Sequence, residues 1–131
     1  MRIALLALLL SAPALAIEKV CADVQMRMFP HDQFGDTDWT AKPTLTRENV
    51  CIRISDDRKT ASASRQVSSG SKPFVYADLT WEPKKKRWLG AIDMELGRVV
   101  VGIADKETFY RFLLIGQGAE AATFTADVPK P

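Results

Sequence analysis

Hydrophobic and polar residues alternate along several short stretches of this chain of 131 residues. The pattern is clearest over residues 20–29 and 50–55, where nearly every second side chain is apolar. A period of two is typical of β-strands that bury one face and expose the other. The predicted buried faces consist of Val20, Ala22, Val24, Met26 and Met28 in the first stretch and of Val50, Ile52 and Ile54 in the second.

Five further short runs, which turn residues separate, predict additional strands. They span residues 60–68, 74–81, 88–96, 98–104 and 122–128. The first of these runs is small and polar, which predicts an edge strand that packs little against a core. The second and third predict a hairpin. Alternation places the apolar side chains of its first arm on one face: Val75, Ala77, Leu79 and Trp81.

Residues 109–115 are compatible with two structures. The spacing of Phe109, Phe112 and Leu113 also fits one face of a helix. The run is short and aromatic, however, and Gly116 follows it, which favours a strand. About eight short strands predict an all-β fold, either a small antiparallel β-sandwich or a barrel with one disulfide.

Residues 1–16 have the parts of a secretory signal peptide. Arg2 supplies a positive charge, residues 3–10 are apolar without interruption, and small residues lead up to Ala16. This arrangement predicts cleavage after Ala16 and a secreted or periplasmic location. The remaining residues, 17–131, have the length of a single domain.

The two cysteines of the chain, Cys21 and Cys51, are expected to form a disulfide. A secreted chain folds in an oxidising compartment, where a lone pair of cysteines is usually bridged. A reactive or metal-binding pair is the alternative. Their separation of 30 residues, without the close spacing of metal-binding cysteines, argues against it.

Charge and composition limit the classes of partner. The chain holds 18 basic and 16 acidic residues, and loss of Arg2 with the signal leaves 17 against 16. This near balance argues against a nucleic-acid-binding domain, which has a marked basic excess. Beyond the signal, no apolar run reaches the roughly 18 residues of a membrane-spanning helix. No metal or cofactor is predicted.

The longest irregular stretch, residues 30–46, is the first candidate contact surface. It holds the single histidine of the chain, His31, together with Asp36, Asp38 and Trp39. Irregular stretches above about 12 residues are usually functional or disordered. A disulfide at the bases of the flanking strands is expected to tether this one. Its aspartates are expected to form Asx turns rather than a cation site, because their spacing differs from that of a calcium loop.

The predicted hairpin carries the second candidate surface. Its tip consists of Lys84, Lys85, Lys86 and Arg87, flanked by Trp81 and Trp88. Two tryptophans placed in this way face each other across the strands, either as a buried pair that closes the core or as an exposed stacking platform. The basic tip is either a solvated turn or a docking point for an anionic partner.

These features favour a non-catalytic binding domain that acts on a protein or glycan partner as an inhibitor, a chaperone-like binder or an accessory subunit. Nucleophilic catalysis needs a base beside a serine or cysteine, and His31 is the single histidine available. A small hydrolase that uses His31 is therefore one alternative. The other is a barrel that carries an apolar ligand in a cavity lined by Met26, Met28, Met94, Phe109 and Phe112.

Overall fold

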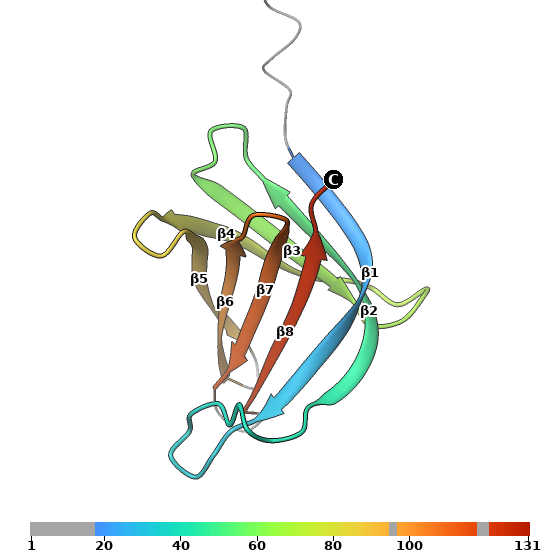
Figure 1. Cartoon of the computed structure of the whole chain (residues 1–131), viewed down its shortest axis with the longest axis vertical. Coiled ribbons are helices and arrows are strands. Elements are labelled where there is room, and N and C mark those ends of the chain that lie inside the picture. The colour runs from blue at the N-terminus through green and yellow to red at the C-terminus, as the bar shows by residue number, and fades with distance from the viewer. Residues whose placement is uncertain (1–17, 95–96, 118–120) are drawn as a thin grey trace, which may run out of the picture.

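Eight antiparallel strands form a closed barrel in the computed structural model of the chain (Figure 1). The structure describes residues 18–94, 97–117 and 121–131, none of which lies in a helix. The predicted signal peptide lies outside these residues. The strands are β1 (Glu18–Pro30), β2 (Thr44–Ile54), β3 (Thr60–Gln66), β4 (Phe74–Glu82), β5 (Arg87–Met94), β6 (Gly97–Asp105), β7 (Phe109–Gly116) and β8 (Ala122–Pro129).

Each strand pairs with its neighbours in the sequence, and β1 pairs with β8 to close the barrel. The closing contact is short and runs from Arg27 opposite Thr125 to Pro30 opposite Ala122. The prediction of an all-β antiparallel fold is confirmed, and the choice between sandwich and barrel is decided in favour of the barrel. Residues 109–115 form a strand, as their flanking glycine indicates.

The barrel has two different ends. Glu18 and the C-terminus lie at one end, together with the β2–β3, β4–β5 and β6–β7 turns, and we call it the terminal end. The β1–β2 loop, residues 31–43, lies at the opposite end, which we call the loop end. Figure 1 shows the C-terminus and the start of β1 close together at the top and the loop at the bottom.

Large side chains fill the inside of the barrel. The alternation of β1 and β2 places Val24, Met26, Val50, Ile52 and Ile54 in this core, as predicted. The largest of the fully buried side chains are Trp88, Tyr110, Phe112 and Met26. Interiors of eight-stranded barrels are just wide enough for side chains to fill or for one small ligand, and large side chains occupy this one. Val20 and Ala22 of the same predicted face are partly buried and pack against this core.

One arm of the predicted hairpin departs from simple alternation. Tyr76 lies opposite Ala63 and Leu79 lies opposite Ala61, so β4 holds one residue more than β3 over the same length. The extra residue is accommodated by a β-bulge in which Asp78 has a φ of 60°. Tyr76 and Leu79 consequently both point inward. The prediction that Val75 and Ala77 share a face with Leu79 is wrong: both are exposed, Val75 to 64%, whereas Leu79 is fully buried.

The prediction of an edge strand at residues 60–68 is also wrong. β3 pairs with β2 on one side and with β4 on the other, because the barrel has no open edge. The small side chains of Ala61 and Ala63 lie on its inner face and are buried. Small residues at these positions leave room for the bulkier side chains of other strands.

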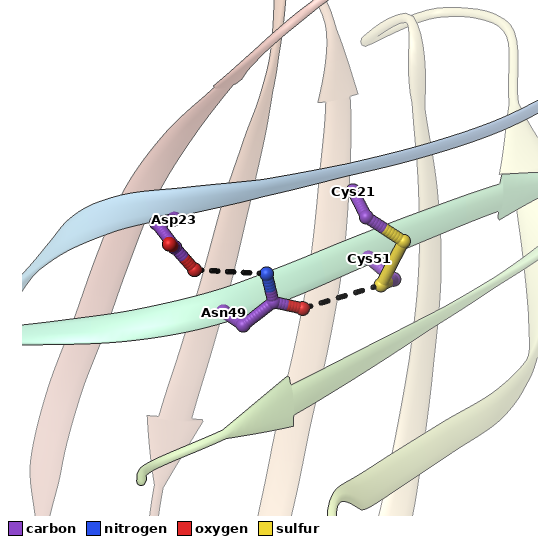
Figure 2. Close-up of a disulfide and its surroundings, with 4 residues drawn as sticks. All are labelled: Cys21, Asp23, Asn49 and Cys51. Atoms are coloured by element: carbon purple, nitrogen blue, oxygen red, sulfur yellow. Dashed lines mark hydrogen bonds between the residues drawn. A yellow bond between two sulfur atoms is a disulfide. The ribbon is translucent and has the colours of Figure 1, made fainter. Parts of the chain in front are cut away.

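Cys21 and Cys51 form the predicted disulfide, on the outer face of the barrel (Figure 2). They lie directly opposite each other on β1 and β2, with their Cα atoms 4.0 Å apart. Next to them, Asn49 Nδ2 donates a hydrogen bond of 3.0 Å to Asp23 Oδ1, and Asn49 Oδ1 lies 3.6 Å from the Cys51 sulfur. The disulfide is compatible with an oxidising extracellular compartment.

The position of the disulfide corrects one expectation. Cys21 lies near the start of β1 and Cys51 lies near the end of β2, so the bridge is closer to the terminal end than to the loop. It staples the two strands together and does not tether the bases of the 31–43 loop.

Replacing both cysteines by alanine should lower the free energy of unfolding by about 3 kcal/mol, because the bridge restricts the unfolded chain over a long loop. The two residues are 30 positions apart in the sequence. Urea titration of the oxidised protein and of the double variant measures the difference. If the urea unfolding curves of the two proteins had the same midpoint and slope, the disulfide would add no stability beyond the pairing of β1 with β2.

Candidate functional site

The 31–43 loop is anchored to β8 by a cluster of polar side chains. His31 and Thr37 pair as an isolated bridge inside the loop. His31 Nε2 and Thr37 Oγ1 lie 2.9 Å and 2.6 Å from Thr123 Oγ1, which is fully buried. These contacts, rather than the disulfide, fix the loop against the barrel wall. Loops that a rigid scaffold positions in this way are common sites of binding.

The aspartates of the loop hold its turns, as the sequence predicts. Asp32 Oδ1 accepts hydrogen bonds from the backbone amides of Phe34 and Asp36, at 2.8 Å and 3.0 Å. Asp38 Oδ1 accepts hydrogen bonds from the hydroxyl and amide of Thr40, which lower the pKa of Asp38. In the described parts of the chain, no group of three or more His, Cys, Asp or Glu side chains is arranged to hold a metal ion.

The hydroxyl that His31 contacts is not placed to act as a catalytic nucleophile. This hydroxyl belongs to Thr123, whose exposed fraction is zero. A nucleophile must be within reach of both its base and the substrate. A fully buried hydroxyl does not meet the second condition, so the geometry supports an anchoring contact.

Trp39 lies at the rim of a groove on the outer wall of the barrel. Its ring packs against Phe29, with the ring centroids 5.0 Å apart and the planes inclined at 57°. The side chain nevertheless remains 57% exposed. The groove has a volume of about 320 Å³ and is lined by Arg27, Phe29, Trp39, Arg111, Leu113 and Thr125. We refer to it as the aromatic–arginine groove.

The floor of the groove crosses three strands that are distant in the sequence. Arg27 on β1 lies opposite Thr125 on β8, and Thr125 lies opposite Leu113 on β7. Closure of the barrel by β1 and β8 is what brings these side chains together. The sequence pattern indicates Trp39 as a candidate contact residue but not the other lining residues, because their proximity depends on that closure.

Positive charge exceeds negative charge in and beside the groove. Asp127 accepts two hydrogen bonds from Arg111, at 2.8 Å and 3.3 Å, and lies 3.8 Å from Arg27 Nη2. The hydrogen bonds to Asp127 raise the pKa of Arg111. One carboxylate thus serves two guanidinium groups. Arg27 Nε is buried and has no hydrogen-bond partner within the described part of the chain.

The basic hairpin tip lies at the other end of the barrel. Lys84, Lys85 and Lys86 are exposed on the β4–β5 turn, whereas Arg87 is bound to Glu82 at 2.7 Å. Successive strands run in opposite directions, so this turn belongs to the terminal end and Trp39 to the loop end. One compact interface therefore does not include both candidate surfaces.

The two hairpin tryptophans form a cross-strand pair, as predicted. Trp81 lies opposite Trp88, and their ring centroids are 4.6 Å apart. Trp88 is fully buried, and its Nε1 donates a hydrogen bond of 2.9 Å to the carbonyl oxygen of Arg58. Trp81 is half-buried and packs against the core. This geometry favours a structural role for the pair over an exposed platform.

An ionic network covers the core at the terminal end. The guanidinium of Arg58 lies 5.3 Å from the centroid of the Trp88 ring and forms salt bridges with Glu18 and Asp105, at 3.7 Å and 3.0 Å. Lys130 adds a second salt bridge to Asp105 at 2.6 Å, and the Tyr110 hydroxyl donates a hydrogen bond to Glu18. The network joins strands from both ends of the sequence.

A buried ion pair lies inside the barrel, toward the loop end. Arg65 Nε and Nη2 donate hydrogen bonds to the two carboxylate oxygens of Glu48, both at 2.8 Å. The Glu48 side chain is 2% exposed and that of Arg65 is 12% exposed. Burial disfavours the charged form of Arg65, but the hydrogen bonds and charge of Glu48 leave its pKa raised. The guanidinium also lies 4.7 Å from the centroid of the Phe124 ring.

Comparison with family models, curated proteins and solved structures found no match to this chain. The described residues also contain no helix long and apolar enough to cross a membrane. We therefore infer function from the side chains of the barrel itself.

Replacing Arg65 by methionine should lower the free energy of unfolding by about 3–5 kcal/mol, because Glu48 is left buried without its partner. The double variant Glu48→Leu, Arg65→Met should recover most of this loss, since it removes both charges together. Denaturant titrations of the wild type, both single variants and the double variant form the cycle. Strictly additive effects would show that the two side chains do not act as a pair.

Both tyrosines of the chain should resist ionisation at alkaline pH. Burial and the hydrogen bond to Glu18 raise the pKa of Tyr110 from 10.0 to about 12, and burial raises the pKa of Tyr76. Stability from the raised pKa of Tyr110 is fully present below pH 10 and is lost as the pH rises through about 12. Tyrosinate absorbance of the folded protein measures this directly, with Tyr110→Phe and the urea-unfolded chain as controls. Ionisation of both tyrosines near pH 10 in the folded protein would contradict it.

Proposed function

We propose that this protein is a secreted, non-catalytic binding domain that recognises a macromolecular partner through the aromatic–arginine groove. Such a domain acts as an inhibitor, a chaperone-like binder or an accessory subunit. The observation that carries the proposal is the exposed Trp39 ring, which packs on Phe29 beside two arginines.

The composition of this surface is that of a binding hot spot. Tryptophan and arginine are enriched among the residues that contribute most to protein interfaces. Because the packing of Trp39 on Phe29 and the Thr123 anchor already restrict the ring, binding has little further ordering to impose on it. Leu45, on β2 opposite Arg27, is half-exposed and extends the apolar surface beyond the groove. These features support a preformed contact surface.

The packing of the barrel interior weighs against the alternative of an apolar-ligand carrier. Of the residues expected to line its cavity, Met26 and Phe112 are fully buried among other core side chains. Phe109 lies beside Arg111, whose guanidinium is 5.2 Å from the centroid of its ring. Toward the loop end, the ion pair of Glu48 and Arg65 occupies the interior. An apolar ligand would have to displace both the packed side chains and buried charges.

Replacing Trp39 by alanine should weaken binding by about 2 kcal/mol or more, mainly through faster dissociation. The partner is captured from periplasmic extract or culture medium on the immobilised, disulfide-bonded domain. It is then purified and its binding kinetics are measured against the wild type and the variant.

Phe34→Ala is the matched control, because Phe34 is an aromatic residue of the same loop that is 79% exposed and does not line the groove. It should leave the kinetics unchanged. Equal dissociation rates for the wild type and Trp39→Ala would place the interface elsewhere and reject the proposal.

A further inference from the structure

We infer that the aromatic–arginine groove recognises a segment of a protein partner in which a carboxylate side chain lies next to an apolar one. This inference rests on the proposed binding function and adds the chemistry of the partner to it. Three observations carry it: the charge of the groove, its unsatisfied donor and the nature of its walls.

The charge of the groove calls for an anionic group. Arg27 and Arg111 share the single carboxylate of Asp127, which leaves one positive charge without a counterpart in this cluster. A second carboxylate placed between the two guanidinium groups would restore the balance. Guanidinium groups bind carboxylates through charge-assisted hydrogen bonds that are stronger than those between neutral groups.

Arg27 has an unsatisfied hydrogen-bond donor, which also favours an anionic ligand. Its Nε has no hydrogen-bond partner within the described residues, and its contact with Asp127, through Nη2, is long at 3.8 Å. An unsatisfied buried donor is unfavourable. A carboxylate placed between the two guanidinium groups, with a shift of the Arg27 side chain toward it, would satisfy this donor. Arg111 would keep its hydrogen bonds to Asp127 and contact the incoming carboxylate through its remaining N–H donors.

The walls of the groove favour a peptide over a sugar. Trp39, Phe29 and Leu113 are apolar, both arginines are donors only, and Thr125 is nearly fully buried. Sugar hydroxyls donate as well as accept hydrogen bonds, and the lining offers them few acceptors. An aliphatic or aromatic side chain next to a carboxylate finds both an apolar wall and a cationic one.

The same charge argument opposes self-association through this surface. In a two-fold symmetric contact, the same patch of each copy meets its counterpart. Arg27 and Arg111 of one copy would then approach the arginines of the other. A partner of opposite charge is therefore favoured over a second copy of this chain.

The first experiment uses the oxidised domain, residues 17–131, and four defined probes. They are a blocked hexapeptide that alternates glutamate and leucine, the same peptide with lysine for glutamate, the same peptide with serine for leucine, and trigalacturonate. Amide and indole chemical shifts report binding at Trp39, Leu113 and Thr125. The glutamate–leucine peptide should bind most tightly. Tighter binding of trigalacturonate, equal binding of the lysine peptide or no binding of any probe would overturn the inference.

Arg111→Gln should weaken binding of the glutamate–leucine peptide about tenfold or more, since it removes a charge-assisted contact. Arg53→Gln is the matched control, because Arg53 is an exposed arginine of β2 that lies outside the groove. Thermal melts confirm that both variants are folded. Equal losses of affinity for the two variants would show that only net charge matters, and this would overturn the inference. Unchanged affinity of the Arg111→Gln variant would overturn it too.

The captured partner separates this inference from the proposed function. If Trp39→Ala speeds its dissociation and Arg111→Gln does not, carboxylate recognition fails while the binding function stands. If neither variant changes its dissociation, both fail. If both variants speed it, the partner uses the aromatic and the cationic wall together, as inferred.

Discussion

The closing contact between β1 and β8 is the interaction on which the rest of the structure depends. It closes the sheet into a barrel, so every strand is paired on both sides over at least part of its length. It also fixes the interior volume, which side chains then fill. A barrel closed and filled in this way is left with its outer wall and its loops as contact surfaces.

Each end of the filled barrel is completed by charged groups rather than by more apolar ones. The salt bridges of Arg58 and Asp105 lie over Trp88 at the terminal end, and the pair of Glu48 and Arg65 lies inside the loop end. The first set joins segments that are far apart in the sequence, whereas the second joins the consecutive strands β2 and β3. The pair of Glu48 and Arg65 is costly to bury unless its two charges meet, so a strand register that separated them would be disfavoured.

Most of the fold could be predicted from the sequence because alternation records which face of a strand is buried. The pattern of β1 and β2 and the cysteine pair were sufficient for the strands and the disulfide. The bulge at Asp78 could not be predicted, because it is defined by the pairing of β4 with β3. The inserted residue changes which side chains of β4 face the core. β3 was misassigned because small residues such as Ala61 look like poor core formers in isolation.

The candidate site was less predictable for a related reason. Trp39 stood out as an aromatic residue in a long loop, but Arg111 gives no local signal and joins the groove only through the pairing of β7, β8 and β1. Glu48 did carry a signal that was missed: it has the same phase as Val50 and Ile52, which places a carboxylate on the inner face. A charged residue that alternates with the core positions of a strand predicts a buried side chain of opposite charge beside it.

The arrangement of the two ends has a consequence for how the domain can be displayed. Glu18 and Lys130 take part in the same ionic network, so the start of β1 and the end of β8 leave the barrel at one pole. Figure 1 shows the 31–43 loop at the opposite end, and Trp39 of this loop is one of the residues that line the groove. If the domain were attached to a surface or to another protein through residues next to Glu18 or Lys130, Trp39 would lie at the end of the barrel away from the attachment point. There it would be accessible to large molecules in solution.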